Sequence, residues 1–475
     1  MSENSLVMNG KPARPPASGE TPGDRYRGSL VEAFEARRGA LPGAELPWLE
    51  AHRRAAIEHF AELGIPTRRH EAWKYTSLDE LARTACQPVN GDPHALGGVV
   101  PALGPFVSAN ITRLVFIDGR FTPEHSQIGQ MPEGAWVTSL GRILQEKPEL
   151  VEPHLTGYAR YEEHPFVALN TAFMSDGAFV QIPEGSYKEL PIHLMYITTP
   201  RSRPALIQPR NLIVAAPGSR VSVVEHYVGL DDAAYCTNAV TEIAAGAGAT
   251  VEHYKLQHES RSAFHLATLE LHQRRDSSIR SHSIAEGARL SRHEINLLLA
   301  GQGAETALYG LYMMDGERHA DHVTQVDHAV PHCTSRQIFK GIMNDAARGV
   351  FTGRVVVRED AQKTVAEQMN RNLLLSDKAL VESRPQLEIY ADDVRCTHGS
   401  ATGRLDEDAI FYLRSRGIGD ADARSLLTYA FASEILRSIR VKLFRTNLEG
   451  IFARWLPAGR MLGEIDESHG APADA

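Results

Sequence analysis

The chain has 475 residues, of which 43% are hydrophobic and 23% are charged, and its net charge is −9. This composition is typical of globular proteins with more than one structural region, and its acidic balance excludes the basic surface that nucleic-acid-binding proteins use. No apolar run approaches the roughly 20 residues of a membrane helix, so neither a nucleic-acid nor a membrane partner is expected.

The N-terminal part of the sequence predicts a tail followed by a helical and mixed region. Residues 1–25 are rich in Pro, Gly and Ser and lack the apolar core of a secretory signal, so we expect a disordered tail. Residues 26–160 form the helical and mixed region. Its clearest helix begins at Pro47 and ends at Gly64, since proline favours the first turn and glycine the end of a helix. The apolar stripe of this helix consists of Trp48, Ala56, Phe60 and Leu63.

From residue 161 to residue 403 short apolar or alternating runs recur between Gly, Pro, Asp and Asn residues, which predicts many short strands. Such strands suit a sandwich, a barrel or a solenoid. An internal repeat favours the solenoid, because "AAPGSRVSVVEHY" resembles "AAGAGATVEHY" and the two Val-Glu-His-Tyr words lie 27 residues apart. We therefore expect a β-solenoid in which His226 and His253 occupy equivalent, stacked positions.

After Gly403 the pattern becomes helical again. The segment "LDEDAIFYLRSRGI" has acidic residues in its first turn and Gly417 as a stop signal, which favours a helix. The next segment predicts one long amphipathic helix, because apolar residues recur at four-residue steps. These residues are Leu427, Phe431, Ile435, Ile439 and Leu443. Their apolar face either packs against the protein's own domain or docks a partner, and the pattern leaves both open.

Cysteine use points to one candidate site. The four cysteines lie far apart without a CxxC pair, so free thiols in the cytoplasm are expected. Cys396 and His398 lie in an alternating segment that follows a predicted corner at Asp392-Asp393. Residues i and i+2 of a strand face the same side, so the two side chains should point together with their roots roughly 7 Å apart.

A thiolate beside an imidazole suits a metal such as iron, zinc or copper. Two ligands complete only half of a tetrahedral site, so any further ligands would come from elsewhere in the fold, from another chain or from solvent. A nucleophilic Cys–His dyad is the rival chemistry, although no signal for an oxyanion hole accompanies it. A buried cysteine beside a hydrogen-bonded histidine, with a purely structural role, is the third alternative.

A second group of ligand-type residues lies between His319 and Cys333. It also contains His322, His328 and His332. The spacing matches no zinc motif, so structural roles are expected, with His319 and His322 on one face if the segment is helical.

The sequence patterns bear on two kinds of enzyme, a P-loop nucleotide hydrolase and a β-helix enzyme that acts on carbohydrate. The chain has no P-loop, since its one Gly-Lys dipeptide is followed by Pro12, so nucleotide hydrolysis by that motif is not expected. A β-helix enzyme that acts on carbohydrate would need exposed carboxylates along a groove. The Asp392-Asp393 pair could imitate this arrangement, but adjacent residues of a strand face apart, and a turn explains the pair better.

The block from His328 to Phe431 resembles the SufB/SufD family of iron–sulfur cluster assembly proteins. The matching segments occur in the family's order and spacing, and they are "AQKT", "NLLLS", "PQLEIYADDV", Cys-x-His-Gly and "FYLRSRGI". Weaker similarity extends to "HEAWKYTSL" and "ALNTAFMSDGAFVQIPEG". Within the family, the Cys-Thr-His sequence and the "WKYTSL" segment look most like the SufD pattern. One local departure is Gly-Ser-Ala-Thr-Gly in place of the usual Gly-Ala-Thr-Val-Gly.

The resemblance implies a mainly β protein with a right-handed parallel β-helix over residues 161–403, flanked by α-helical regions at residues 26–160 and 404–475. It implies a scaffold subunit of the SUF complex that is not an enzyme, pairs with a SufB-like scaffold and binds the SufC-like ATPase. A homodimer remains an option for the isolated chain.

The resemblance also implies a metal site and a docking region. Iron or a nascent iron–sulfur cluster would be bound transiently at the SufB-like interface by His398 and Cys396, with no permanently held cofactor. The C-terminal helical region would dock the ATPase. The candidate contact residues there are Phe411, Tyr412, Leu427, Phe431 and Ile435.

Overall fold

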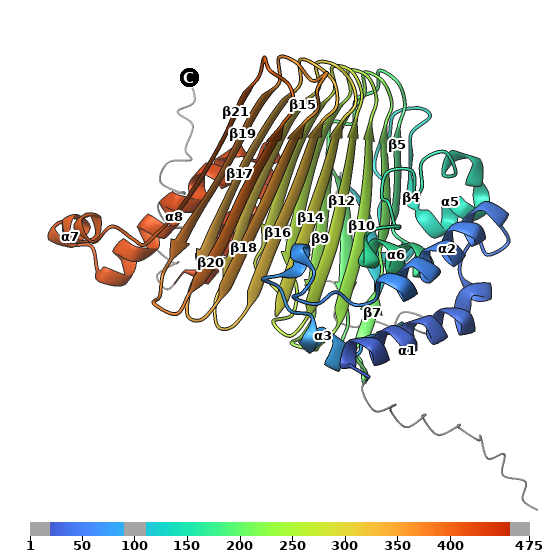
Figure 1. Ribbon diagram of the computed structural model, residues 1–475, viewed down its shortest axis with the longest axis horizontal. Helices are drawn as coiled ribbons and strands as arrows, with labels where there is room; N and C mark the ends of the chain where they lie inside the picture. Colours follow the sequence, from blue (N-terminus) through green and yellow to red (C-terminus); the bar gives the residue numbers. More distant parts are fainter. Residues whose placement is uncertain (1–19, 90–110, 457–475) are drawn as a thin grey trace, which may run out of the picture.

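The computed structural model describes residues 20–89 and 111–456. Its core is a β-solenoid in which two parallel sheets face each other, with helices on the outer side of each sheet (Figure 1). The mainly β architecture with helical N- and C-terminal regions confirms the fold class expected from the sequence. None of the helices within these two ranges has both the length and the apolar character needed to cross a membrane.

Each coil of the solenoid contributes one strand to each sheet. In spatial order, sheet A contains β20 (Leu380–Ile389), β18 (Arg348–Val357), β16 (His319–His328), β14 (Leu290–Leu299), β12 (Phe264–Gln273), β10 (Cys236–Ala245), β8 (Arg210–Ala215), β5 (Ala178–Ile182) and β4 (Trp136–Ser139), with β7 (Ala205–Ile207) and β1 (Gln87–Pro88) beside β10. Sheet B contains β21 (Arg395–Gly403), β19 (Val365–Leu374), β17 (Thr334–Met343), β15 (Glu305–Met314), β13 (Ser278–Ala285), β11 (Thr250–His258), β9 (Arg220–Gly229), β6 (Ile192–Thr198), β2 (Thr112–Ile117) and β3 (Arg120–Phe121).

The internal repeat predicted the solenoid but not its register. Strands β9 and β11 pair with an offset of 30 residues, rather than the 27 that separate the two Val-Glu-His-Tyr words. Because side chains alternate along a strand, this shift of three residues places the two words on opposite faces. His226 stacks on His193 at the outer face, whereas His253 faces inward and lies 3.2 Å from Glu225. The expected equivalence of His226 and His253 is therefore wrong.

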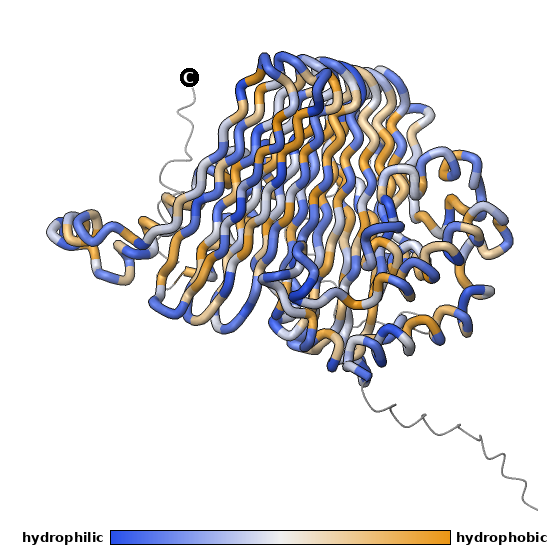
Figure 2. The backbone as a smooth tube through the Cα atoms, in the orientation of Figure 1, coloured by the Kyte–Doolittle hydropathy of each residue, from blue (hydrophilic) through white to orange (hydrophobic). Residues whose placement is uncertain are grey.

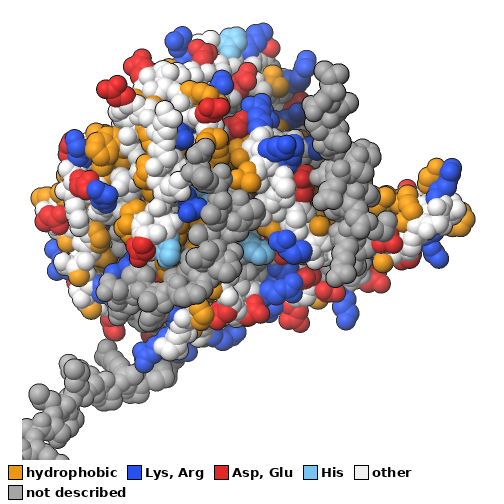
Figure 3. Space-filling model, turned by 180° about the vertical axis from the view of Figure 1, so that it is seen from behind, with side chains coloured by type: hydrophobic (Ala, Val, Ile, Leu, Met, Phe, Trp, Pro, Cys, Tyr) orange, Lys and Arg blue, Asp and Glu red, His pale blue; other side chains and the backbone are white. Residues whose placement is uncertain are grey.

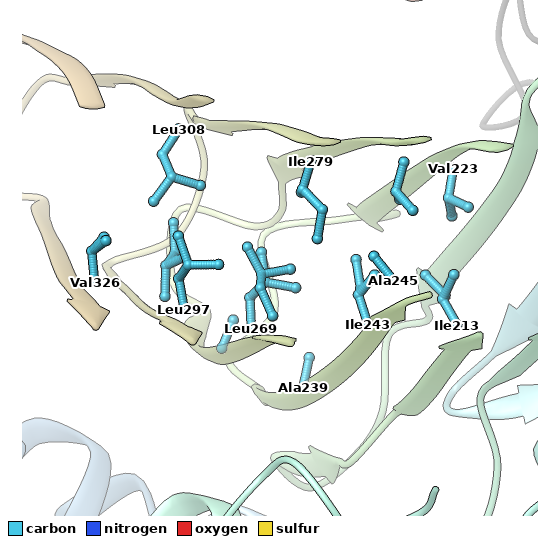
Figure 4. Close-up of a cluster of buried hydrophobic side chains, with 14 of the residues drawn as sticks. Ile213, Val223, Ala239, Ile243, Ala245, Leu269, Ile279, Leu297, Leu308 and Val326 are labelled. Atoms are coloured by element: carbon cyan, nitrogen blue, oxygen red, sulfur yellow. The ribbon is translucent and has the colours of Figure 1, made fainter. Parts of the chain in front are cut away.

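The core lies between the two sheets. Figure 4 shows Ile243 and Leu269 of sheet A pointing toward Val223 and Ile279 of sheet B, and all four are buried. Hydrophobic and hydrophilic residues alternate along many strands (Figure 2), as expected when every second side chain enters the interior. A single coil cannot cover its own apolar face, so each coil depends on its neighbours in the stack.

The N-terminal region contains the helices α1 (Pro22–Arg37), η1 (Arg38–Ala40), α2 (Pro47–Leu63), η2 (Glu71–Trp73), α3 (Asp79–Thr84), η4 (Pro123–His125), α5 (Leu140–Glu146), η5 (Pro148–Leu150) and α6 (Pro165–Phe173). Most of them pack on the outer face of sheet A, whereas η4 contacts β2 of sheet B. Helix α2 begins at Pro47 and ends before Gly64, whose φ of 68° favours glycine, which confirms the predicted helix.

Other expectations for this region need correction. Helix α1 begins at Pro22 behind a capping box of Thr21 and Asp24, so residues 22–25 are helical, while residues 1–19 of the expected tail lie outside the described residues. Strands β2 and β4 already belong to the two sheets, so the solenoid sheets begin before residue 161, and α6 lies within the region predicted as strands. Leu63 is 37% exposed and does not continue the buried stripe of α2.

Between the last coil and residue 456, where the described part ends, there are three helices: α7 (Glu407–Ser415), α8 (Asp420–Ser438) and α9 (Lys442–Trp455). Helices α8 and α9 pack on the outer face of sheet B. The expectation of one long helix is wrong, because the chain becomes extended at Ile439. Contacts with β11 hold this break, since the Arg440 N–H donates to Tyr254 Oη at 3.3 Å and the Arg440 guanidinium donates to Glu252 at 2.9 Å.

A fully buried ion pair fastens the N-terminal region to sheet A. Arg210 of β8 donates to Glu242 of β10 at 3.0 Å, and neither side chain is accessible to solvent. The same carboxylate accepts hydrogen bonds from the backbone N–H groups of Thr156, Tyr158 and Ala159. A buried pair is stable only when its remaining hydrogen-bonding groups are also satisfied, and here the loop before α6 satisfies them.

Replacing Glu242 with glutamine should lower the free energy of unfolding by about 3–5 kcal/mol, because the Arg210 charge would stay buried without a counter-charge. Chemical denaturation of the full chain measures this loss. The matched control is Glu388→Gln, which breaks a pair with Arg354 in which both side chains are partly exposed. The control should cost much less, because solvent screens an exposed ion pair. Equal losses from the two substitutions would contradict the anchoring role.

Candidate functional site

Cys396 and His398 lie on β21, the last strand of sheet B. In the parallel register Cys396 pairs with Ala366 and His398 pairs with Gln368, and both of these β19 residues are buried. The cysteine and the histidine therefore share the inward side of β21, as expected from their spacing. Cys396 is half-buried against the interior cluster, whereas His398 is exposed.

This exposure follows from the position of β21 in the stack. Strands β20 and β21 form the terminal coil, and in the described sheets each is paired on one side only (Figure 1). Positions that point into the interior of earlier coils therefore lie at an open end here. A hydrogen bond of 2.8 Å between Ser400 Oγ and Ser383 Oγ joins the two strands across this end.

The thiol of Cys396 is held in its protonated form in the free chain. Burial raises the pKa of the Cys396 thiol, and a hydrogen bond with the backbone of Ala366 opposes this shift only in part. The thiolate is the form that binds metals, so a metal must displace the proton. His398 makes no hydrogen bond or ion pair with any other described residue.

The Cys396–His398 pair is an incomplete ligand set. No group of three or more His, Cys, Asp and Glu side chains that could hold a metal ion occurs in residues 20–89 and 111–456. A tetrahedral zinc site or an iron–sulfur cluster normally takes four ligands, and this pair offers one sulfur and one nitrogen from a single face.

The histidine-rich segment from His319 to Cys333 does not form a metal site. It forms strand β16 and the following corner, so the expectation of a shared helical face is wrong, and His319 and His322 face opposite sides. His319 lies 2.9 Å from Thr76 Oγ1 outside the sheet, and His322 lies 3.4 Å from Ser283 Oγ inside the solenoid. These contacts are structural.

The two terminal strands differ in the chemistry of their free edges. Strand β20 has Pro385 at its centre and carries charged residues at positions 382, 384 and 388, which discourage the addition of another strand. Strand β21 has no proline and no Lys, Arg, Asp or Glu after Arg395. At the same terminal coil, the side chains of Leu380 and Tyr390 are 52% and 63% exposed. Analysis of the sequence did not identify this open edge, although a proline within a strand was a signal for it.

Helix α7 presents a second exposed surface. It projects from the solenoid in Figure 1, and Figure 3 shows apolar side chains on the same projection from behind. Phe411 and Tyr412 are 73% and 57% exposed. The helix is capped by Asp406, whose carboxylate accepts the Asp408 N–H at 2.9 Å. Adjacent exposed aromatic residues on a capped, projecting helix are typical of an interaction surface.

Two other candidate contact residues pack against sheet B. Ile435 is fully buried against sheet B, and Phe431 packs against the same cluster, with Lys340 Nζ 4.8 Å from the centre of its ring. The inclusion of Ile435 among the partner-binding residues needs correction, because its side chain holds α8 to its own domain, whereas Phe431 is half-buried and stays a prediction. Leu427 is half-buried.

A cavity of about 420 Å³ lies on the outer face of sheet A, and several of its charged groups form ion pairs with one another. The Arg292 guanidinium lies 3.9 Å from the centre of the Trp73 ring and donates to Glu294 at 2.9 Å. Burial alone would raise the pKa of Glu294, but the Arg292 charge and a hydrogen bond with His164 outweigh burial and lower the pKa to about 2. These contacts fasten N-terminal segments to the sheet.

The fold and the site together define a β-solenoid protein with an uncovered terminal coil, a Cys-x-His pair on that coil and a projecting helix beyond it. The chain belongs to the SufBD family of iron–sulfur cluster assembly proteins. The family model for the SUF system FeS cluster assembly, SufBD core domain, matches residues 196–431. The model for the SufBD protein N-terminal region matches residues 25–91 and 105–194.

Similarity to individual relatives covers most of the chain. It is 35% identical to an iron–sulfur cluster assembly SufBD family protein of Synechocystis, over 84% of this chain and 89% of the relative. It is 32% identical to the iron–sulfur cluster assembly protein SufD of Escherichia coli, over 85% of this chain and 93% of the relative. It is 26% identical to the iron–sulfur cluster assembly protein SufD of Bacillus subtilis, over 86% of this chain and 94% of the relative. The chain is thus SufD-like, which confirms the resemblance seen in the Cys-x-His block.

Glu270 of β12 should make the stability fall as the pH rises. Burial raises its pKa from 4.5 to about 8, so between these values the folded chain keeps a proton that the unfolded chain has lost. Glu270→Gln removes this penalty and retains the acceptor for Asn296. The melting temperature of the variant should exceed that of the wild type increasingly from pH 5 to pH 8.

The matched control is Glu294→Gln on the neighbouring strand. It removes the carboxylate that pairs with Arg292 and His164, so it should lower the melting temperature at pH 8. A constant difference between Glu270→Gln and the wild type across the pH range would show that Glu270 ionises normally.

Proposed function

We propose that the chain is the SufD-type, non-ATPase scaffold subunit of a SUF iron–sulfur cluster assembly complex. It pairs with a SufB-like scaffold through its terminal coil and binds a SufC-like ATPase through its C-terminal helical region, and it is not an enzyme by itself. The observation that carries this proposal is the incomplete Cys396–His398 pair on a strand with an unpaired edge. Both the ligand set and the sheet need a second chain for completion.

Pairing through β21 is supported by the chemistry of its edge. The unpaired backbone N–H and C=O groups of an edge strand are satisfied when another chain adds a strand to the sheet. Such a strand would bring its own side chains beside Cys396 and His398. Membership of the SufBD family supports a SufB-like solenoid as the partner. The same edge would allow a homodimer of the isolated chain.

Iron or a nascent iron–sulfur cluster is the proposed cargo of this interface. The Cys396 sulfur and a His398 nitrogen are donors that iron accepts. Two donors hold a metal weakly, so binding is transient and becomes complete only with the partner's ligands. Because the thiol must lose its proton before it binds, falling pH should release the cargo.

The C-terminal helices are the proposed link to the ATPase. Phe411 and Tyr412 on α7 are exposed, while α8 is tied to β17 by Lys340, whose Nζ donates to the Phe431 carbonyl at 2.8 Å and pairs with Glu434 at 2.6 Å. Strand β17 is two strands from β21 in sheet B. A partner that moves with its nucleotide cycle would therefore pull on the sheet that carries the candidate site.

The cytoplasm is the proposed location. All four cysteines are free, as expected for a reducing compartment.

His398→Ala should lower the yield of reconstituted cluster in the purified complex by about tenfold or more. The loss of a metal ligand should reduce metal binding more than the loss of a residue that only orients a ligand. The folding and co-purification of the subunits should not change, since His398 is exposed and its side chain makes no hydrogen bond or ion pair with other described residues. Iron and sulfide content after anaerobic reconstitution measures the yield.

Thr397→Ala is the matched control, because Thr397 is exposed on the opposite face of the same strand. It should leave the yield unchanged. A wild-type yield from His398→Ala would remove the site assignment.

Charged substitutions on the two exposed surfaces should separate the two partners. Phe411→Asp with Tyr412→Asp should weaken binding of the ATPase subunit by about 30-fold or more, since buried aromatic anchors contribute at least 2 kcal/mol to many interfaces. Leu380→Asp with Tyr390→Asp should weaken the scaffold pair by a similar factor. Co-purification and analytical ultracentrifugation measure both.

Each double variant serves as the control of the other. The α7 variant should keep the scaffold pair, and the β20 variant should keep the ATPase. Loss of both partners in either variant would show unfolding or a single shared surface, and would contradict the two-surface arrangement.

A further inference from the structure

A column of side chains runs through the interior of sheet B to the open end. Gln337 on β17, Gln368 on β19 and His398 on β21 pair in register, so neighbouring members lie about 4.8 Å apart. The two glutamines are 1% and 2% exposed, whereas His398 is exposed at the end of the column. Gln368 is therefore the layer directly beneath the candidate site.

The side-chain amide of Gln368 is buried and unsatisfied. Neither Oε1 nor Nε2 has a hydrogen-bond partner among the residues that the structure describes. In the layer below, Gln337 is satisfied in part, because its Oε1 accepts a hydrogen bond from Thr324 Oγ1 at 2.7 Å while its Nε2 has no partner among the described residues. A buried amide without partners costs about 1–3 kcal/mol, and a side chain such as leucine would occupy this place without that cost. The polar group at Gln368 therefore calls for a role other than packing.

The opposite sheet leaves space for this amide. Gly353 of β18 lies across the interior, and a Cβ atom there would come within 2.3 Å of Gln368 Nε2. In the next layer of sheet A, Gly353 pairs with Pro385, whose side chain has no hydrogen-bonding group to offer the amide. In the next layer of its own column, Gln368 pairs with His398. The imidazole is thus the polar group that lies directly next to the amide in this column.

We propose that Gln368 is the positioning residue of His398. Its side-chain carbonyl accepts a hydrogen bond from one ring N–H, which leaves the lone pair of the other ring nitrogen directed out of the solenoid. Histidines that bind metals commonly have such an acceptor, because it selects the tautomer and fixes the ring. The hydrogen bond itself does not depend on the proposed function, whereas the identity of the cargo as iron rests on it.

The need for such a residue follows from the exposed position of His398. The ring has no other contact with described residues that would orient it, and its rotational freedom would be lost when cargo binds. A carbonyl fixed between Gly353 and the column can supply the orientation before binding. The site then extends one layer into the solenoid, beyond the two residues of the motif.

The test uses the full chain with ¹⁵N-labelled histidine and the variants Gln368→Met, Gly353→Ala and Gln337→Met. Methionine keeps the length of glutamine but has no carbonyl oxygen, and a Cβ at position 353 displaces the amide without changing it. Gln337→Met is the matched control one layer deeper. The NMR signals of His398 are assigned by comparison with His398→Gln, and they report which ring nitrogen carries the proton at pH 8.

The wild type should show one dominant tautomer of His398, and Gln368→Met and Gly353→Ala should both show a mixture, while Gln337→Met resembles the wild type. In the complex with its partners, the part of the Fe²⁺ affinity that depends on His398 should fall by about 10–100-fold in Gln368→Met. Anaerobic equilibrium dialysis against Fe²⁺ alone measures it.

Wild-type tautomer populations in both Gln368→Met and Gly353→Ala would overturn the positioning role. The same changes in all three variants, Gln337→Met included, would also overturn it, because the effect would then be general loosening of the interior. A changed tautomer with Fe²⁺ affinity and cluster yield that do not depend on His398 would support the positioning role and overturn the proposed metal site.

Discussion

The stacking of parallel coils is the constraint on which the rest of this protein depends. A coil covers its apolar face and satisfies its backbone groups only where another coil lies beside it. Strands β20 and β21 are paired on one side, so positions that are buried in earlier coils are open in this one. Cys396 and His398 occupy two of these positions. Their access to solvent, their incomplete ligand set and the free strand edge beside them have a common origin, because the stack ends at the coil that carries them.

The helical regions determine which surfaces remain for partners. The N-terminal region packs on the outer face of sheet A, where the buried Arg210–Glu242 pair holds it, and α8 and α9 pack on the outer face of sheet B. The terminal coil and α7 lie beyond this cover (Figure 1). These two surfaces are separate and differ in kind, one a strand edge and the other a projecting aromatic pair. The proposed function assigns the strand edge to a second scaffold and the projecting helix to an ATPase.

Polar side chains occur in the interior of early and late coils, and several of those in earlier coils are paired. His253 lies 3.2 Å from Glu225, and Thr241 donates to the same carboxylate, whereas the amide of Gln368 has no hydrogen-bond partner among the described residues. A buried polar group destabilises the core unless it is paired, so an unpaired amide near the open end agrees with an end that meets another polar surface. Burial also holds Cys396 as a thiol until a cation displaces its proton.

The sequence by itself determined the solenoid, the corner before β21, the shared face of Cys396 and His398, and the family, because local periodicity and short motifs carry this information. Only the tertiary structure decided the register, which places His226 and His253 on opposite faces, and the end of α8, which depends on contacts with β11. The sequence also did not predict the burial of Ile435, because an amphipathic pattern does not show which surface covers the apolar face of the helix. The exposure of His398 depends on where the stack of coils stops, and a property of the whole stack is not contained in any local segment.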